Sequence, residues 1–348
     1  MSALTLPPSQ IPIFSTVSSF RAWRSRAFEE SKSVGFVATM GALHDGHLSL
    51  VKRSLQENDL TVLSIFVNPA QFAPNEDLAT YPRTLPRDLE LLTAQSVSVP
   101  HITTTETSPF LRMPSAVFLP SVSEMYPSGI SQDRDSQRGT FIEVKGYGDE
   151  MEGKSRPGFF RGVATVVTKL FNVIQPTNTY FGQKDIQQAL LLRRLTRDLL
   201  LSHPTPSSLH IIPTTRDPTS GLALSSRNAY LTPDERAVAG GTLYEALRTG
   251  EQAWMNGETK EECVRKARGV VENVSGGKEA RDKSVNVSLD YIEMNDADSF
   301  EVIGDGEVVG TRHEGREREG VILSGAIWVG KTRLIDNIVL GDMGKILG

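Results

Sequence analysis

Two histidines stand three residues apart between a predicted strand and a predicted helix. The apolar run Val34–Thr39 predicts a buried strand, and a helical spacing of apolar residues begins at Leu48. His44 and His47 lie between these runs, together with Gly46. A helix N-terminus presents free N–H groups and a partial positive charge, so this segment suits a phosphate. A zinc site would need a third ligand, and no Cys pair or HExxH pattern accompanies the histidines. A plain helix cap stays an open interpretation.

A pair of side-chain amides follows the next apolar run. Asn68 and Gln71 come directly after Leu60–Val67, which is predicted to be a second buried strand. Amides at the carboxyl end of a strand suit the hydroxyl and carboxylate oxygens of a small polar acid. Taken alone, an Asn-Pro turn with an incidental Gln is the better interpretation of this segment.

Two further segments carry charge that suits a polyphosphate. Lys184 and Asp185 follow the predicted strand 178–181; the ammonium suits phosphate and the carboxylate can accept from ribose hydroxyls. Ser225, Ser226 and Arg227 lie in a Gly/Pro/Thr-rich loop, where hydroxyls and a guanidinium suit phosphate oxygens. Loops of this composition can close over a substrate and exclude water. A surface ion pair and an ordinary polar loop are the alternatives.

These segments need a scaffold that brings the ends of separate strands together. Helical and strand-like runs alternate between residues 13 and 212, which predicts an α/β domain with a doubly wound, Rossmann-like parallel sheet. Helices are expected at 18–30, 48–58, 87–94, 162–173 and 185–200, and strands at 34–39, 60–67, 97–99, 178–181 and 209–212.

From Pro213 the pattern changes, and a smaller C-terminal α+β domain is predicted over 213–348. It carries the loop 214–228 as a flap over the site, helices at 233–249 and 260–274, and strands at 288–294, 321–329 and 332–339. Residues 1–12 are predicted to be a flexible tail. The segments 129–149 and 304–320 are expected to be exposed insertions or hairpin tips, and 276–283 is expected to be an insertion.

Composition excludes some classes of partner. The 348 residues carry a net charge of −5, which argues against a general nucleic-acid binder. No apolar run approaches the roughly 20 residues that span a bilayer, so no membrane partner is predicted. The single cysteine, Cys263, excludes an internal disulfide and indicates a reducing compartment. We expect a cytoplasmic protein; the basic residues 20–26 leave a mitochondrial location as a minor alternative.

In order along the chain, these segments resemble the signatures of the pantothenate synthetase family, within the HxGH nucleotidylyltransferase-like superfamily. The resemblance rests on residues 37–50 (VATMGALHDGHLSL), 66–72 (FVNPAQF), 152–160 (EGKSRPGFF), 181–188 (FGQKDIQQ) and 221–231 (GLALSSRNAYL). The chain departs from the family pattern at Ala38, Phe159 and Leu224, where Pro, His and Met are usual.

The resemblance implies an ATP-dependent condensation of pantoate with β-alanine through a pantoyl-adenylate, releasing AMP and pyrophosphate. It implies Mg²⁺ as a companion of ATP, Asp88 as a candidate metal ligand, and a homodimer. The catalytic residues it implies are His44, His47, Lys184 and Arg227, with His47 as proton donor or strongest phosphate contact. Pantoate and β-alanine would be bound by Gln71, and pantoate also by Asn68 and Gln188. The implied ATP-binding residues are Met40, Gly41, His44, Gly46, His47, Gly182, Lys184, Asp185, Thr215, Leu224, Ser225, Ser226 and Arg227.

Two other functions are open at this point. A nucleotidylyltransferase of the same superfamily would need extra basic residues for an acceptor phosphate, where this chain has Asn68 and Gln71. A non-catalytic nucleotide-binding protein would be expected to lack the histidines or the flap cations, and this chain has both.

Overall fold

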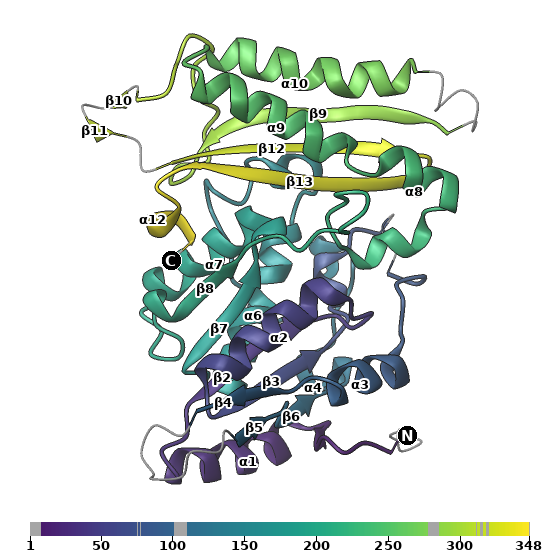
Figure 1. Ribbon diagram of the computed structural model, residues 1–348. Coiled ribbons are helices and arrows are strands. Elements are labelled where there is room, and N and C mark those ends of the chain that lie inside the picture. Colours follow the sequence, from purple (N-terminus) through teal and green to yellow (C-terminus); the bar gives the residue numbers. More distant parts are fainter. Residues whose placement is uncertain are drawn as a thin grey trace. The chain divides into compact units, whose positions relative to one another are not determined.

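The computed structural model describes residues 8–347, except 75, 77, 101–109, 278–284, 311, 314, 315, 318 and 319. The chain divides into two compact units, whose elements are labelled in Figure 1. The first consists of Met1–Gly182 and Gln187–Ile212, and the second of Gln183–Ile186 and Pro213–Gly348. Each unit has its own hydrophobic core.

The first unit is built on a parallel sheet. In its described part, six strands pair in the order β1, β6, β3, β2, β7, β8, and every pairing is parallel. Parallel strands end at one edge, where ligands of open α/β sheets bind. Therefore the loops after β2, β3 and β7 share an edge. The strands are β1 (Ile13–Phe14), β2 (Val34–Thr39), β3 (Leu60–Ile65), β6 (Ala116–Phe118), β7 (Asn178–Gly182) and β8 (Leu209–Ile212).

Helices cover both faces of this sheet. Side chains alternate along β2: the Phe36 ring packs on Phe171 of α6, with ring centroids 6.4 Å apart, whereas Val37 joins a cluster with Val51 and Leu55 of α2. This alternation confirms the predicted doubly wound sheet. The helices of the unit are α1 (Val17–Glu29), α2 (Asp45–Glu57), α3 (Leu85–Thr93), α4 (Val122–Met125), α5 (Glu152–Ser155), α6 (Phe159–Ile174) and α7 (Ile186–Asp198).

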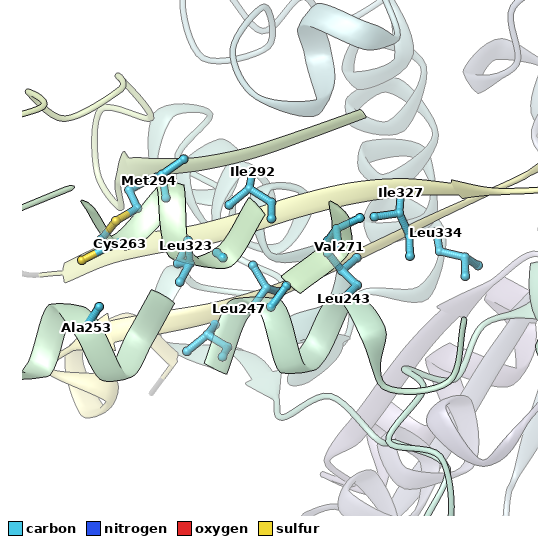
Figure 2. Packing of buried hydrophobic residues seen from close by; sticks show 14 of the residues in the cluster. Leu243, Leu247, Ala253, Cys263, Val271, Ile292, Met294, Leu323, Ile327 and Leu334 are labelled. Atoms are coloured by element: carbon cyan, nitrogen blue, oxygen red, sulfur yellow. The ribbon is translucent and has the colours of Figure 1, made fainter. Parts of the chain in front are cut away.

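The second unit pairs an antiparallel sheet with two long helices. Its strands run in the order β13, β12, β9, and the predicted α+β character is confirmed. Figure 2 shows the core between sheet and helices, in which Leu247, Cys263 and Leu323 are fully buried. The main elements are α8 (Pro233–Ala239), α9 (Thr242–Met255), α10 (Lys260–Ser275), β9 (Val287–Asp296), β12 (Gly320–Val329), β13 (Thr332–Gly341) and α12 (Met343–Leu347).

Several sequence expectations were wrong in detail. The single helix expected at 233–249 is two helices, because Gly241 takes a positive φ of 76° between α8 and α9. Strands β1 and β6 belong to the parallel sheet but were not predicted. Strand β4 (Val97–Val99) lies outside that sheet and pairs antiparallel with β5 (Phe110–Arg112).

The expected insertions differ from one another. Segment 129–149 contains a 3₁₀ turn, η2 (Arg134–Ser136), and no strand in its described residues. Segment 304–320 does hold a hairpin, in which β10 (Arg312–His313) and β11 (Arg316–Glu317) pair antiparallel. Of segment 276–283, residues 278–283 lie outside the described residues. None of the helices in the described ranges combines the length and apolar content that crossing a bilayer requires.

Candidate functional site

The loop after β2 takes an unusual backbone path that one carboxylate holds. Gly41 and Ala42 have positive φ values of 83° and 51°, a conformation that disfavours most side chains. The Asp88 carboxylate accepts the N–H groups of Ala42 and Leu43, at 3.1 and 2.8 Å. Thr84 donates its hydroxyl to the same carboxylate at 3.1 Å. Asp88 is 1% exposed, so this buried charge fixes the loop that carries the histidines.

Asp88 is therefore poorly suited to the expected role of metal ligand. Its oxygens already accept three hydrogen bonds from the protein. Among the described residues, no group of three or more His, Cys, Asp or Glu side chains could hold a metal ion. Carboxylates and carbonyls are the usual protein ligands of Mg²⁺. Within the described ranges, the donor set shows no preformed cage for a resident Mg²⁺ ion, which commonly binds through substrate phosphates and only one or two carboxylates.

The two histidines sit at the first turn of α2. His44 is the N-cap, and its Nδ1 accepts the N–H of Gly46 at 3.1 Å. An accepting Nδ1 carries no proton, so the proton of the neutral His44 ring is on Nε2. The rings of His44 and His47 lie with centroids 4.1 Å apart. The His47 and Leu48 N–H groups bond the His44 carbonyl, at 2.8 and 3.1 Å, so the helix N-terminus offers mainly its partial positive charge, together with the Nε2–H of His44.

The amide pair after β3 is part of a closed hydrogen-bond network. Asn68 donates from Nδ2 to Gln71 Oε1 at 3.1 Å and to the Gly162 carbonyl at 3.2 Å. Its Oδ1 accepts the Ala70 N–H at 3.4 Å and the Tyr126 hydroxyl at 2.7 Å. A side-chain amide has two donors and two acceptor positions, so these four bonds use them all. Asn68, at 1% exposure, therefore supports Gln71, and its expected contact with pantoate stays a prediction.

Arg156 holds the backbone of Gln71. Its guanidinium makes two 2.7 Å bonds to the Glu76 carboxylate, and Nη2 also donates to the Gln71 carbonyl at 3.3 Å. The Phe159 ring stacks on it, with Cζ 3.8 Å from the ring centroid. The residue that replaces the family's usual His therefore packs on the arginine that anchors Gln71.

The two glutamines at the start of α7 have different surroundings. Gln187 is 3% exposed and fixes the segment before α5. It donates to the carbonyls of Tyr147 and Glu150, at 3.2 and 2.8 Å, and accepts the Glu152 N–H at 3.0 Å. Gln188, the expected pantoate ligand, is half-buried. Gln187 is thus a structural anchor, which the motif alone did not distinguish from its neighbour.

In the second unit, a buried asparagine holds the turn that contains Lys184. Asn337 of β13 donates from Nδ2 to the carbonyls of Gln183 and Lys184, both at 2.9 Å. Lys184 Nζ lies 3.5 Å from the Asp185 carboxylate, and the lysine side chain is 19% exposed. The 3₁₀ turn η3 (Gln183–Asp185) therefore presents its cation from a fixed backbone.

The loop expected to be a flap is a compact hairpin. Arg216 and Ala223 form an antiparallel bridge. At its tip, Asp217 Oδ1 accepts from the Thr219 and Ser220 N–H groups, at 3.0 and 2.7 Å. At its base, Arg216 pairs with Asp336, which is 4% exposed. The hairpin is ordered by its own hydrogen bonds, in contrast to the loose loop that its composition suggested.

The serines and arginine follow this hairpin directly. The Leu224 N–H donates to the Thr215 carbonyl at 3.0 Å. Ser225 is the N-cap of the 3₁₀ helix η5 (Ser226–Tyr230) and accepts the Arg227 N–H at 3.3 Å. Ser225, Ser226 and Arg227 are half-buried. The predicted ATP residues of this unit therefore lie on one short, capped segment and on the turn η3.

The first unit groups its own predicted residues at one sheet edge. The loop 40–47 follows β2, Asn68 and Gln71 follow the adjacent strand β3, and Gly182 ends β7, which pairs with β2. Neighbouring strands lie roughly 5 Å apart, so these segments are close. The sequence did not reveal Tyr126, because it is 58 residues from Asn68 and lies outside the segments that carry the expected site residues.

Comparison with known proteins connects this arrangement to a family. The family model described as Pantoate-beta-alanine ligase matches residues 12–339. The pantothenate synthetase of Moorella thermoacetica is 42% identical over 328 residues, which cover 94% of this chain and 98% of that protein. The pantoate–beta-alanine ligase of Saccharomyces cerevisiae is 38% identical over 338 residues, covering 94% and 99%.

Solved structures give the same result. The pantothenate synthetase of Thermus thermophilus superimposes with a TM-score of 0.73 at 35% identity, covering 94% of this chain and 99% of that one. The ligase of Francisella tularensis, solved with beta-gamma ATP and beta-alanine, has a TM-score of 0.65 at 31% identity, covering 94% and 97%. In both sequence and fold, this chain belongs to the pantoate–β-alanine ligase family.

Proposed function

We propose that this protein condenses pantoate with β-alanine at the expense of ATP, forming pantothenate, AMP and pyrophosphate through a pantoyl-adenylate. The observation that carries the proposal is the family match over residues 12–339, in a chain that has the histidine loop and the amide pair on adjacent strand ends. The ATP and β-alanine present in the Francisella tularensis structure support the choice of co-substrates.

In the first step, a carboxylate oxygen of pantoate attacks the α-phosphorus of ATP. The bond from that phosphorus to the bridging oxygen breaks, and pyrophosphate leaves with the electron pair. Gln71 and Gln188 hold pantoate, while His44 and His47 donate hydrogen bonds to the phosphates. Such donors act by stabilising charge that develops in the transition state. His47 is the proton donor to the leaving group or its strongest contact.

In the second step, the free amine of β-alanine attacks the acyl carbon of the mixed anhydride. The bond from that carbon to the phosphate oxygen breaks, AMP leaves, and the nitrogen loses a proton. Excluding water protects the anhydride from hydrolysis. In this scheme Gln71 lies near both pantoate and β-alanine.

The remaining predicted residues bind the nucleotide. Met40, Gly41 and Gly46 offer backbone contacts at the loop after β2, and Gly182 and Asp185 lie beside the ribose. Lys184, Ser225, Ser226 and Arg227 bind phosphate oxygens, and Thr215 and Leu224 lie near adenine. In this proposal residues 13–212 form the ATP- and pantoate-binding domain, and residues 213–348 form a smaller domain whose hairpin segment closes over the reactants.

Three further expectations accompany the proposal. Mg²⁺ enters bound to the ATP phosphates, because this ion usually binds through substrate phosphates with only one or two protein carboxylates. The protein is a homodimer, which sedimentation equilibrium of the purified chain tests. It acts in the cytoplasm, which fractionation of the source cells tests against the mitochondrial alternative.

Isotope transfer tests the adenylate directly. Pantoate labelled with ¹⁸O in its carboxylate should pass one ¹⁸O to the phosphate of AMP, because the attacking oxygen stays on phosphorus when the amine displaces it. The label is read by mass spectrometry of the AMP. Unlabelled AMP, or ATP–pyrophosphate exchange that needs no pantoate, would refute the adenylate and favour a nucleotidylyltransferase.

Replacing His47 tests the catalytic assignment. His47→Ala should lower kcat by about 10²- to 10³-fold, the usual effect of removing one donor to transition-state charge. The pantoate-dependent ATP–pyrophosphate exchange rate measures this step alone. His203→Ala is the control, because His203 lies in the connection between α7 and β8, away from the predicted site motifs. Wild-type turnover in His47→Ala would remove that residue from the mechanism.

A further inference from the structure

Gln71 has a donor side and an acceptor side, and the described residues form a hydrogen bond only with the acceptor. Its Oε1 receives Nδ2 of Asn68 at 3.1 Å. Within the described ranges no hydrogen bond is formed by its Nε2. The residue is half-buried at the carboxyl end of β3. An amide held in this way turns both N–H donors away from Asn68, and one of the two acceptor positions of Oε1 is already used.

The orientation of Asn68 cannot be reversed without loss. The Gly162 carbonyl, which can only accept, lies 3.2 Å from Nδ2, and the Ala70 N–H, which can only donate, points to Oδ1 at 3.4 Å. The Tyr126 hydroxyl adds the shortest bond of the set, 2.7 Å to Oδ1. Hydrogen bonds in a chain polarise one another, so the hydroxyl strengthens the donor that Asn68 presents to Gln71.

Tyr126 is itself fixed in place. It is 4% exposed and follows α4. The Lys169 ammonium donates to the Met125 carbonyl at 2.7 Å and lies 3.9 Å from the centroid of the Tyr126 ring. Burial raises the pKa of Tyr126 well above its ordinary value, although the bond to Asn68 partly opposes this. The hydroxyl is therefore protonated throughout any practical assay range and acts as a donor.

We propose that Tyr126 is a positioning residue for substrate recognition: through Asn68 it locks the Gln71 amide with its NH₂ group toward the bound acid. The proposal rests on the proposed function and deepens it. Gln71 then recognises acceptor oxygens, a carboxylate or hydroxyl of pantoate, through its two N–H donors. In this scheme Tyr126 does not contact a substrate. It acts only through the side-chain amides of Asn68 and Gln71.

Tyr126→Phe removes one hydroxyl and keeps the ring. Initial rates of AMP release, measured against pantoate at saturating ATP and β-alanine, should show a KM for pantoate raised about tenfold, the effect of roughly one lost hydrogen bond. The KM for ATP and kcat should stay within about twofold, since the phosphate contacts are unchanged. An unchanged KM for pantoate would overturn the proposal.

Tyr180→Phe is the matched control. Tyr180 is fully buried in the same unit, and its hydroxyl bonds Asn58 at 2.7 Å and Glu57 at 2.8 Å, at the far end of α2 from His44. It should lower the thermal midpoint without changing the KM for pantoate. An equal rise in that KM in Tyr180→Phe would show a general loss of packing and would also overturn the proposal.

The double variant tests whether the effect passes through Gln71. In a Gln71→Ala background, Tyr126→Phe should add no further rise in the KM for pantoate; an additive rise would refute the relay. Gln71→Glu, which presents only acceptors, should raise that KM more than Gln71→Ala does, and the opposite order would contradict the donor role. These comparisons need an active wild type. Absence of pantoate-dependent AMP release from the wild type would instead count against the proposed function.

Should Tyr126→Phe fail to fold, Asn68→Ala removes the centre of the same chain of bonds. It should give the same selective rise in the KM for pantoate. Wild-type KM in that variant would overturn the proposal.

Discussion

At the scale of single residues, several polar side chains near the expected site act on the protein rather than on a ligand. Asp88 holds the backbone of the histidine loop, and Gln187 holds the segment before α5. Asn68 saturates its amide within the protein. The sequence predicted that polar side chains lie near the site, because polar residues follow the strands. It did not predict which of these side chains faces a substrate, because each hydrogen-bond partner comes from elsewhere in the chain.

Asp88→Asn should weaken the loop after β2. The amide can accept one of the two N–H groups but turns its own NH₂ toward the other, leaving a buried donor without a partner. The free energy of unfolding should fall by about 1–3 kcal/mol, and kcat should fall because the histidines lose their fixed position. Chemical denaturation and steady-state rates of AMP release measure the two effects.

Asp59→Asn is the control for this change. Asp59 also accepts a backbone N–H and a hydroxyl, both from Ser33, at 2.9 and 2.7 Å, but it lies before β3, away from the carboxyl edge. Its kcat should equal that of the wild type. If the activity of Asp88→Asn instead returned to normal when the Mg²⁺ concentration was raised, Asp88 would be assigned as a metal ligand.

At the scale of elements, the sequence predicted long apolar runs well and short ones poorly. Strand β2 was predicted with its observed bounds, because six consecutive residues are apolar or small. Strand β6 is only three residues long, too short for any periodicity to show. The break between α8 and α9 was missed because apolar helical spacing continues on both sides of Gly240 and Gly241. The helices are separated by the extended ψ of 116° at Gly240 and the positive φ of Gly241.

Gly162 shows how one helix residue sets the position of the amide pair. A Cβ at this point of α6 would lie 2.2 Å from the Ala70 carbonyl oxygen and 2.7 Å from the Gln71 nitrogen. Gly162→Ala should gain helix propensity, worth up to about 1 kcal/mol. The overlap with backbone should cost about 1–3 kcal/mol, so we expect a net loss of stability and a raised KM for pantoate.

Gly269→Ala measures the gain in helix propensity without the steric overlap expected for Gly162→Ala. Gly269 lies inside α10, and a Cβ there would meet nothing within 4 Å. This variant should be more stable than the wild type, with unchanged kinetics. Thermal unfolding compares the stabilities of the two variants, and pantoate saturation curves compare their KM values. A Gly162→Ala protein that matches Gly269→Ala in both measurements would contradict the close packing of α6 on the 3₁₀ turn η1 (Pro69–Gln71).

At the scale of the whole molecule, two separate cores stabilise the two compact units. The cluster around α2, α3 and the parallel sheet contains Leu92, which is fully buried. The cluster between α9, α10 and the antiparallel sheet contains Leu247 and Cys263, also fully buried. Burial raises the pKa of the Cys263 thiol to about 11, and the nearby Glu258 carboxylate adds to this effect. The only cysteine of the chain is thus unreactive in the folded protein and reports on the second core alone.

Leucine truncation in each core should separate the two units energetically. Leu247→Ala and Leu92→Ala remove the same atoms from fully buried sites, and each should cost about 2–5 kcal/mol. Labelling of Cys263 by an aromatic disulfide at pH 8 should be accelerated by Leu247→Ala, because the second core opens more often. Leu92→Ala should leave the labelling rate near that of the wild type while lowering the stability of the first unit, as followed by loss of pantoate-dependent AMP release on heating. Equal acceleration by the two variants would mean that the cores open together as one cooperative body.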